Sequence, residues 1–113
     1  MRELSRIFKA LSDKNRIRII KMLQCKPMCV CELAEVLGLA MSTVSKHLTI
    51  LRDVELINDL KDGKWVDYSL SRSSRTVYAR ELLRSMSKWL NEDDAVKADI
   101  RKAGKVSRKG ICG

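Results

Sequence analysis

The spacing of apolar residues along this chain changes from a helical period to alternation at Leu56. Before Leu56, apolar residues recur every three or four positions, as on helices that bury one face. From Leu56 to Leu70 they alternate with polar residues on either side of Asp62-Gly63. An Asp-Gly pair between two alternating runs is a strong signal for a β-hairpin. The chain is therefore predicted to be mainly α-helical, with one small hairpin.

Four helices are predicted before the hairpin and one after it. Ser12-Asp13 supplies a cap for the second helix, and Gly38 supplies a stop signal for the third. The fifth helix begins within residues 71–74 and carries an apolar stripe that reaches Leu90. The other expected segments are the helices Leu4–Leu11, Lys14–Gln24, Val30–Leu37 and Met41–Glu55 and the strands Leu56–Leu60 and Trp65–Leu70.

A short helix, a tight turn at Gly38 and a longer helix with a polar face predict a helix-turn-helix, and the basic hairpin after it corresponds to a wing. The expected fold is a winged helix-turn-helix in the order helix, helix, helix, helix, strand, strand, helix. The second helix of such a unit enters the major groove of DNA. The candidate DNA-binding residues carry hydroxyl, imidazole or cationic groups, and they are Ser42, Thr43, Ser45, Lys46, His47, Arg52, Lys61 and Lys64.

The net charge of the chain also favours DNA as the partner. In 113 residues, 23 Lys and Arg stand against 14 Asp and Glu, a net charge of +9 that favours a polyanion such as double-stranded DNA. The length allows one domain, expected over residues 1–90, and residues 91–113 are expected to form a basic, flexible tail. No acid–base pair, nucleophile with a His partner or phosphate-binding Gly loop indicates an enzyme.

Neither a membrane span nor a secretory signal is indicated. No apolar run approaches the ~20 residues that a membrane span needs. The N-terminus lacks the apolar core of a secretory signal, so a cytoplasmic location is expected.

Several motifs, in order and spacing, resemble the ArsR/SmtB family of winged-helix repressors. The resemblance runs from about Leu4 to Leu90 and implies a homodimer, joined through the first and last predicted helices, that binds a palindromic operator and is released by an inducer. Within the family pattern, Ala40 stands where a Ser or Thr is frequent, and Lys14 stands where a Pro is common. The motifs are Phe8–Asp13, Arg16–Ile19, Cys29–Ala34, Ser42–Leu48 and Gly63–Tyr68. The resemblance makes Thr43, Ser45, Lys46 and His47 the foremost DNA contacts.

Four cysteines indicate metal or redox chemistry, since structural disulfides are rare in a reducing compartment. Cys29-Val30-Cys31 resembles the arsenic-sensing subgroup, in which paired thiolates at this place bind trivalent arsenic or antimony. The resemblance thus implies As(III) or Sb(III) as inducer, and no organic cofactor is expected. Cys25 and Cys112 are two candidates for a third ligand, and the alternative is that Cys25 packs in the core and Cys112 is idle.

The position of the Cys29–Cys31 pair suggests a switch. A nearby helix N-terminus is expected to lower the pKa of both thiols. Residues two apart in a regular helix point about 200° apart. One ion that binds both sulfurs is therefore expected to unwind the first turn and to shift the following helix, the one that enters the major groove.

Other readings stay open. The same cysteines could sense cadmium or lead, or an oxidant or persulfide. The domain could also bind DNA without sequence preference, as an interaction module. A zinc or nickel sensor with a His set on its last helix is disfavoured, because His47 is the only histidine.

Overall fold

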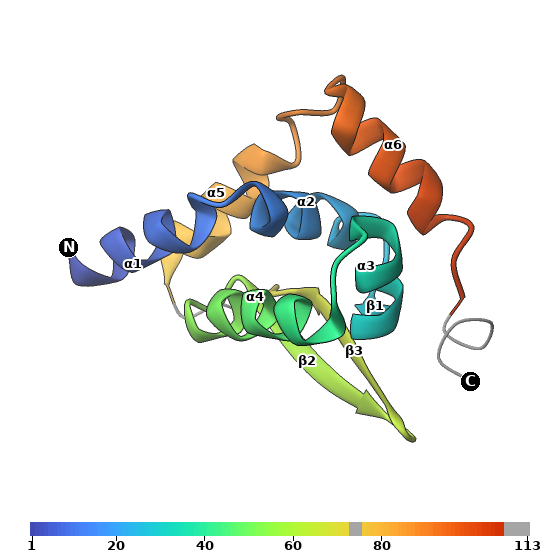
Figure 1. The fold of residues 1–113 in the computed structure, drawn as a ribbon. Helices are drawn as coiled ribbons and strands as arrows, with labels where there is room; N and C mark the ends of the chain where they lie inside the picture. Colours follow the sequence, from blue (N-terminus) through green and yellow to red (C-terminus); the bar gives the residue numbers. More distant parts are fainter. Residues whose placement is uncertain (73–75, 108–113) are drawn as a thin grey trace.

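The computed structural model describes residues 1–72 and 76–107 of the chain. The winged helix-turn-helix predicted from the sequence is confirmed, with two elements more than expected, a short strand β1 and a helix α6 (Figure 1). The elements are α1 (Arg2–Leu11), α2 (Lys14–Leu23), β1 (Met28–Cys29), α3 (Val30–Leu37), α4 (Met41–Asp53), β2 (Ile57–Asp62), β3 (Trp65–Leu70), α5 (Val77–Met86) and α6 (Asp94–Ala103).

The turn between α1 and α2 is held by Asp13, the predicted cap. Its side chain accepts hydrogen bonds from the N–H groups of Asn15 at 2.8 Å and Arg16 at 3.1 Å. Burial alone would raise the pKa of the Asp13 carboxyl, but these hydrogen bonds and the Arg16 charge outweigh burial and lower the pKa. The cap is therefore a carboxylate at neutral pH.

Two left-handed residues mark the ends of α3 and α4. Gly38, with φ 68°, follows α3 and lets the chain turn toward α4. Glu55, with φ 62°, follows α4, and the N–H groups of Glu55 and Leu56 donate to the carbonyls of Arg52 and Leu51. This pair of bonds is a Schellman motif, so α4 ends at Asp53, two residues before the predicted end.

The sheet has three antiparallel strands in the order β1-β3-β2. The predicted hairpin is present as β2 and β3, which turn at Gly63 with φ 61°. Strand β1 adds to the other edge of β3 and pairs Met28 with Tyr68 and Cys29 with Asp67. The short segment just before α3 is thus part of the same sheet as the wing.

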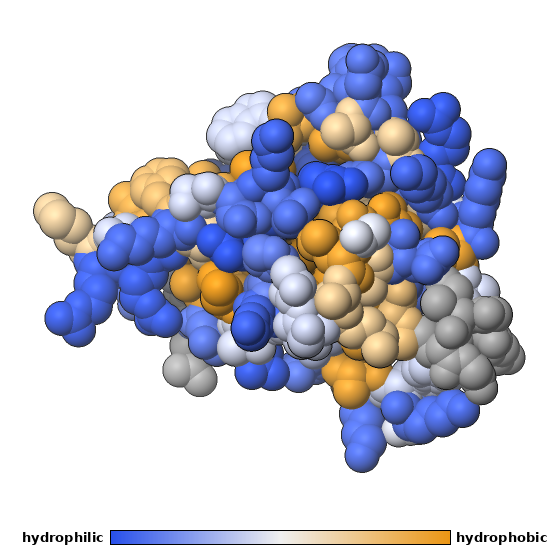
Figure 2. Space-filling view, in the orientation of Figure 1, coloured by the Kyte–Doolittle hydropathy of each residue, from blue (hydrophilic) through white to orange (hydrophobic). Residues whose placement is uncertain are grey.

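The core lies between α2, α3, α4 and the sheet. Helix α2 contributes Ile19 and Ile20, and α4 contributes Leu48 and Leu51, all of which are buried. Figure 2 shows that polar side chains cover most of one face of the molecule, with apolar surface confined to patches, one of them over α1 beside α5. No helix among the described residues is long and apolar enough to cross a membrane.

The C-terminal part differs from the expectation in two ways. Helix α5 ends at Met86, so Trp89 and Leu90 lie beyond it and are exposed instead of extending its apolar stripe. The prediction of a flexible tail is wrong for Asp94–Ala103, because these residues form α6, which packs on α2 and α3 (Figure 1). The assignment of residues 1–90 as the DNA-binding and dimerisation domain stays a prediction.

An ion pair fixes α6. Two of the three guanidinium nitrogens of Arg18 in α2, Nε and Nη2, donate to the carboxylate of Asp99 in α6, at 2.7 and 2.8 Å. The Asp99 side chain is 3% exposed. Hydrogen bonding to Asp99 raises the pKa of Arg18 further, so the guanidinium stays charged.

Candidate nucleic-acid interface and thiol site

The first half of α4 presents a polar face. Ser42, Thr43, Ser45 and Lys46 are exposed, as the sequence predicted, while the opposite side of the helix is buried in the core. Their hydroxyl and ammonium groups suit base edges and phosphate oxygens. DNA contact by these residues stays a prediction.

His47 lies differently from its neighbours on α4. It is half-buried, and its Nδ1 lies 3.1 Å from Nη1 of Arg16 in α2. The same guanidinium donates through Nε to the carbonyl of Ala10 at 2.6 Å, at the end of α1. Sequence reasoning missed Arg16 as a partner of His47, because 31 positions separate them.

Arg52 lies apart from the other candidate residues of α4. It stands in the last turn of the helix, and its Nη1 pairs with Asp59 of β2 at 3.2 Å. Both side chains are more than a third exposed, 44% and 40%. The structure thus places Arg52 between α4 and the wing rather than with Ser42–Lys46.

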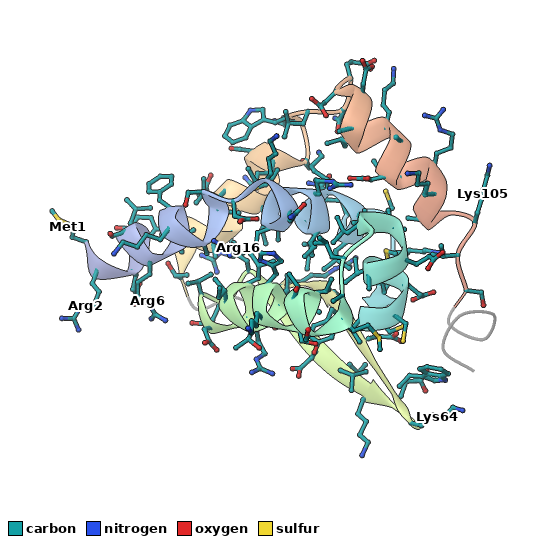
Figure 3. All side chains as sticks on the ribbon, viewed as in Figure 1. Met1, Arg2, Arg6, Arg16, Lys64 and Lys105 are labelled. Atoms are coloured by element: carbon teal, nitrogen blue, oxygen red, sulfur yellow. The ribbon has the colours of Figure 1, made fainter. Side chains whose placement is uncertain are left out.

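The wing and α1 present further cations. Lys61 and Lys64 are exposed on the hairpin, and Nζ of Lys64 lies 5.0 Å from the ring centre of Trp65. Figure 3 shows Arg2 and Arg6 of α1 directed to the same side of the molecule as α4 and as Lys64 at the tip of the wing. The sequence signalled these arginines only through the net charge of +9.

Cys29 is the N-cap of α3 and is 2% exposed. Its N–H donates to Oε1 of Glu32 at 3.0 Å, and its sulfur faces the backbone N–H of Glu32. This is a capping box in which sulfur takes the place of a Ser or Thr hydroxyl. Burial raises the pKa of the Cys29 thiol, and the backbone N–H groups of Glu32 and Cys31 offset this only in part. The expectation of a lowered pKa is therefore wrong for Cys29.

The other cysteines lie in different surroundings. Cys31 is half-buried in the first turn of α3 and takes part in a disulfide in this structure, so its sulfur reaches an ion only after reduction. Cys25 is exposed and carries a free thiol, which contradicts a core-packing role. Cys112 lies outside the described residues.

The geometry of the Cys29–Cys31 pair corrects one premise of the predicted switch. Cys29 has extended backbone angles, φ −89° and ψ 169°, and only Cys31 is helical, so the separation expected for two helical positions does not apply. In the described part of the chain no three Cys, His, Asp or Glu side chains are grouped to hold an ion. The pair fits a thiophilic ion in donor type, but it is not a complete preformed site.

Cys29 nevertheless connects the parts that surround it. Its backbone belongs to β1 and pairs with Asp67 of β3, which is the inner strand of the wing. Its sulfur and N–H cap α3, and α3 packs against α4. A displacement of Cys29 therefore acts on both the wing and the helix-turn-helix.

An apolar groove of about 240 Å³ lies between α1, α2 and α5. Phe8 and Trp89, at its rim, are 54% and 53% exposed. The one charged lining residue, Lys21, turns its Nζ away to the carbonyl of Met86 at 2.7 Å and to Oδ1 of Asn91 at 2.9 Å. The lining residues are Phe8, Leu11, Ile17, Lys21, Leu82, Met86, Trp89 and Leu90.

Comparison with known proteins agrees with the fold. Residues 13–59 match the family model described as bacterial regulatory protein, arsR family. The arsenical resistance operon repressor of Escherichia coli (strain K12) is 32% identical over 105 residues, which cover 92% of this chain and 87% of the relative. The arsenical resistance operon repressor of Staphylococcus aureus is 39% identical over 72 residues, 64% of this chain and 69% of the relative.

A solved structure agrees as well. The cadmium metal-sensor CMTR from Mycobacterium tuberculosis is similar with a TM-score of 0.59 and 32% identity, over 77% of this chain and 83% of the sensor. These relatives are regulators rather than enzymes, and the fold and the polar face of α4 agree with a DNA-binding transcriptional regulator. The chain belongs to the ArsR family of bacterial regulatory proteins.

Proposed function

We propose that this protein represses a metalloid-resistance operon and leaves its operator when As(III) or Sb(III) binds the thiolates of Cys29 and Cys31 in the reduced chain. The observation that carries the proposal is the position of Cys29, which caps α3 and pairs with the wing strand β3. Two relatives named as arsenical resistance operon repressors support the choice of ion.

The burial of Cys29 gives the proposed switch its mechanism. Because the side chain is 2% exposed, an ion can bind its sulfur only if Cys29 leaves the cap. Loss of an N-cap costs about 1 kcal/mol, and the two β1–β3 residue pairs loosen with it. The first turn of α3 then shifts. Helix α4, which packs against α3, and the edge of the wing sheet shift with it.

The proposed DNA interface is the polar face of α4 together with the wing. Thr43, Ser45, Lys46 and His47 enter the major groove, and Lys61 and Lys64 contact phosphates or the minor groove. A second copy of the chain covers the apolar groove between α1 and α5. The supporting observation is that, within residues 1–72 and 76–107, six of the ten exposed large apolar residues belong to α1, α5 or the segments that flank these helices: Met1, Phe8, Val77, Tyr78, Trp89 and Leu90.

The switch is tested on a duplex selected from a random-sequence library with the reduced protein. Anisotropy titrations measure operator affinity with and without arsenite, for the unaltered chain and for Cys29→Ser, Cys31→Ser and Cys25→Ser. Arsenite is expected to weaken binding at least tenfold in the unaltered chain and in the Cys25→Ser control, and to have no effect in the other two. Release of DNA from Cys29→Ser by arsenite, or arsenite binding without release, would contradict the switch.

A second candidate is a sensor of cadmium, favoured by the similarity to a cadmium sensor and by the thiol ligands. Parallel titrations with cadmium, lead, antimonite and peroxide separate the ions from one another and from an oxidant. Cys112→Ser, measured in the same series, tests whether Cys112 supplies a third ligand. Equal affinity for the selected and a random duplex would instead identify a module without sequence preference.

The dimer has its own test, sedimentation equilibrium of a Phe8→Glu/Trp89→Glu variant. Two buried carboxylates in an apolar interface are expected to leave the protein monomeric. Leu60→Glu is the matched control, because Leu60 is an apolar residue that is 72% exposed on the wing. Dimers of the double variant as stable as those of the control would place the interface elsewhere.

A further inference from the structure

The contact between Arg16 and His47 fixes where the imidazole carries its proton. A guanidinium has hydrogen-bond donors and no acceptor. Nδ1 of His47, 3.1 Å from Nη1 of Arg16, must therefore be the acceptor. An imidazole that accepts at Nδ1 carries its proton at Nε2. In this contact the ring is thus a donor through Nε2.

Arg16 itself is held in place independently of His47. Its Nε donates to the carbonyl of Ala10 at 2.6 Å, and its backbone N–H donates to the Asp13 carboxylate at 3.1 Å. Figure 3 shows Arg16 between α2 and α4. The guanidinium is therefore fixed by α1 and by the start of α2 before it meets the ring on α4.

We propose that Arg16 is a positioning residue of the DNA interface, which holds His47 in one tautomer so that its Nε2–H donates to a hydrogen-bond acceptor of the bound duplex. This inference rests on the proposed function. The acceptor is an oxygen or nitrogen, either of a phosphate or of a base edge such as O6 or N7 of guanine. Arg16 acts through His47 and does not itself contact DNA.

The tautomer is tested without DNA. Because His47 is the only histidine, the imidazole ¹⁵N spectrum has a single ring to assign. At alkaline pH, where imidazole is neutral, we expect one protonated nitrogen, Nε2, and one unprotonated nitrogen, Nδ1. In Arg16→Met the two tautomers are expected to mix. A spectrum with the proton on Nδ1, or one unchanged by Arg16→Met, overturns the proposal.

The positioning role is tested by a double-mutant cycle on the selected duplex. Arg16→Met is expected to weaken binding about threefold to tenfold, the range for one hydrogen bond, and to have no further effect in a His47→Ala background. Independent, additive losses would mean that Arg16 contacts DNA or only supports the fold, and would overturn the proposal. With coupled losses, equal effects on selected and random duplexes identify a phosphate as the acceptor, and an effect confined to the selected duplex identifies a base.

A second pair of variants decides the matter if Arg16→Met does not fold. The amide nitrogen of Gln can take the place of Nε2, whereas that of Asn takes the place of Nδ1. We expect His47→Gln to keep most of the affinity and His47→Asn to lose it, and equal affinities overturn the proposal. An unaltered chain that binds no duplex would refute the proposed function, while the ¹⁵N spectrum would still report on the Arg16–His47 pair.

Discussion

Glu55 adopts a backbone conformation that favours glycine. Its φ of 62° closes the Schellman motif at the end of α4, where a side chain costs about 1 kcal/mol relative to glycine. Glu55→Gly is therefore expected to raise the free energy of unfolding by about 1 kcal/mol, measured by urea denaturation. Glu35→Gly, the same substitution at an exposed position inside α3, should lower it by a similar amount. A loss of stability in both variants would contradict the role of φ at Glu55.

The thiol of Cys29 makes stability depend on alkaline pH. Its pKa in the folded protein lies above the ordinary value of 9.0, because burial disfavours the thiolate. The contribution of the neutral Cys29 thiol to the free energy of unfolding is complete below pH 9.0. It is lost as the pH rises through the higher pKa that Cys29 has in the folded protein. We expect the Tm of the reduced protein to fall more steeply above pH 9.0 than that of Cys29→Ser. Parallel Tm profiles would contradict this linkage.

Single residues also mark the limits of what sequence reasoning could predict for the site. The exposure of Ser42, Thr43, Ser45 and Lys46 followed from the apolar period of α4. The Arg16–His47 contact did not, because it depends on how two helices cross. The burial of Cys29 could not be foreseen either, since Cys-x-Cys specifies the ligand type and not whether the first sulfur faces solvent or caps a helix.

Among the elements, α6 is held mainly by one ion pair and a few apolar side chains. Asp99→Asn leaves Arg18 without its charged partner and is expected to destabilise the protein by about 2–3 kcal/mol, less than for a fully buried pair because Arg18 is 27% exposed. Asp59→Asn removes the exposed pair with Arg52 and should cost less than about 1 kcal/mol. Urea denaturation of both variants gives the comparison, and equal losses would mean that α6 is not anchored by Asp99.

The elements that the sequence predicted correctly are those long enough to show a period. The two-residue strand β1 has no period of its own, and only its pairing with β3 defines it. In α6 the apolar residues Val96, Ile100 and Ala103 have helical spacing, but the charged residues between them give the segment the composition of a tail. The Asp93 cap was the available signal for this helix.

On the scale of the whole molecule, positive charge on α1 extends the predicted DNA face. Arg2 and Arg6 point to the side of α4 and the wing tip (Figure 3). Removing a cation that binds one phosphate reduces the slope of log affinity against log salt by about 0.9. Arg2→Gln/Arg6→Gln is therefore expected to reduce the slope by about 2 to 4 per dimer, on selected and random duplexes alike.

The control for charge alone is Arg101→Gln/Lys102→Gln. It removes the same charge from exposed positions of α6, which packs on α2 and α3 rather than on α4. Its salt slope should match that of the unaltered protein. If the α1 and α6 variants change the slope equally, net charge and not local phosphate binding governs the affinity.

The dual membership of Cys29, in a sheet edge and in a helix cap, constrains any attempt to re-engineer the protein as a biosensor for a different ion. In the proposed switch, replacing the sulfur donor changes ion selectivity and, in the same step, the position of the wing on DNA. Detection threshold and background expression are therefore coupled outputs of one position. New ligands are better introduced within α3, at Cys31 and the positions that follow it, with Cys29 left unchanged.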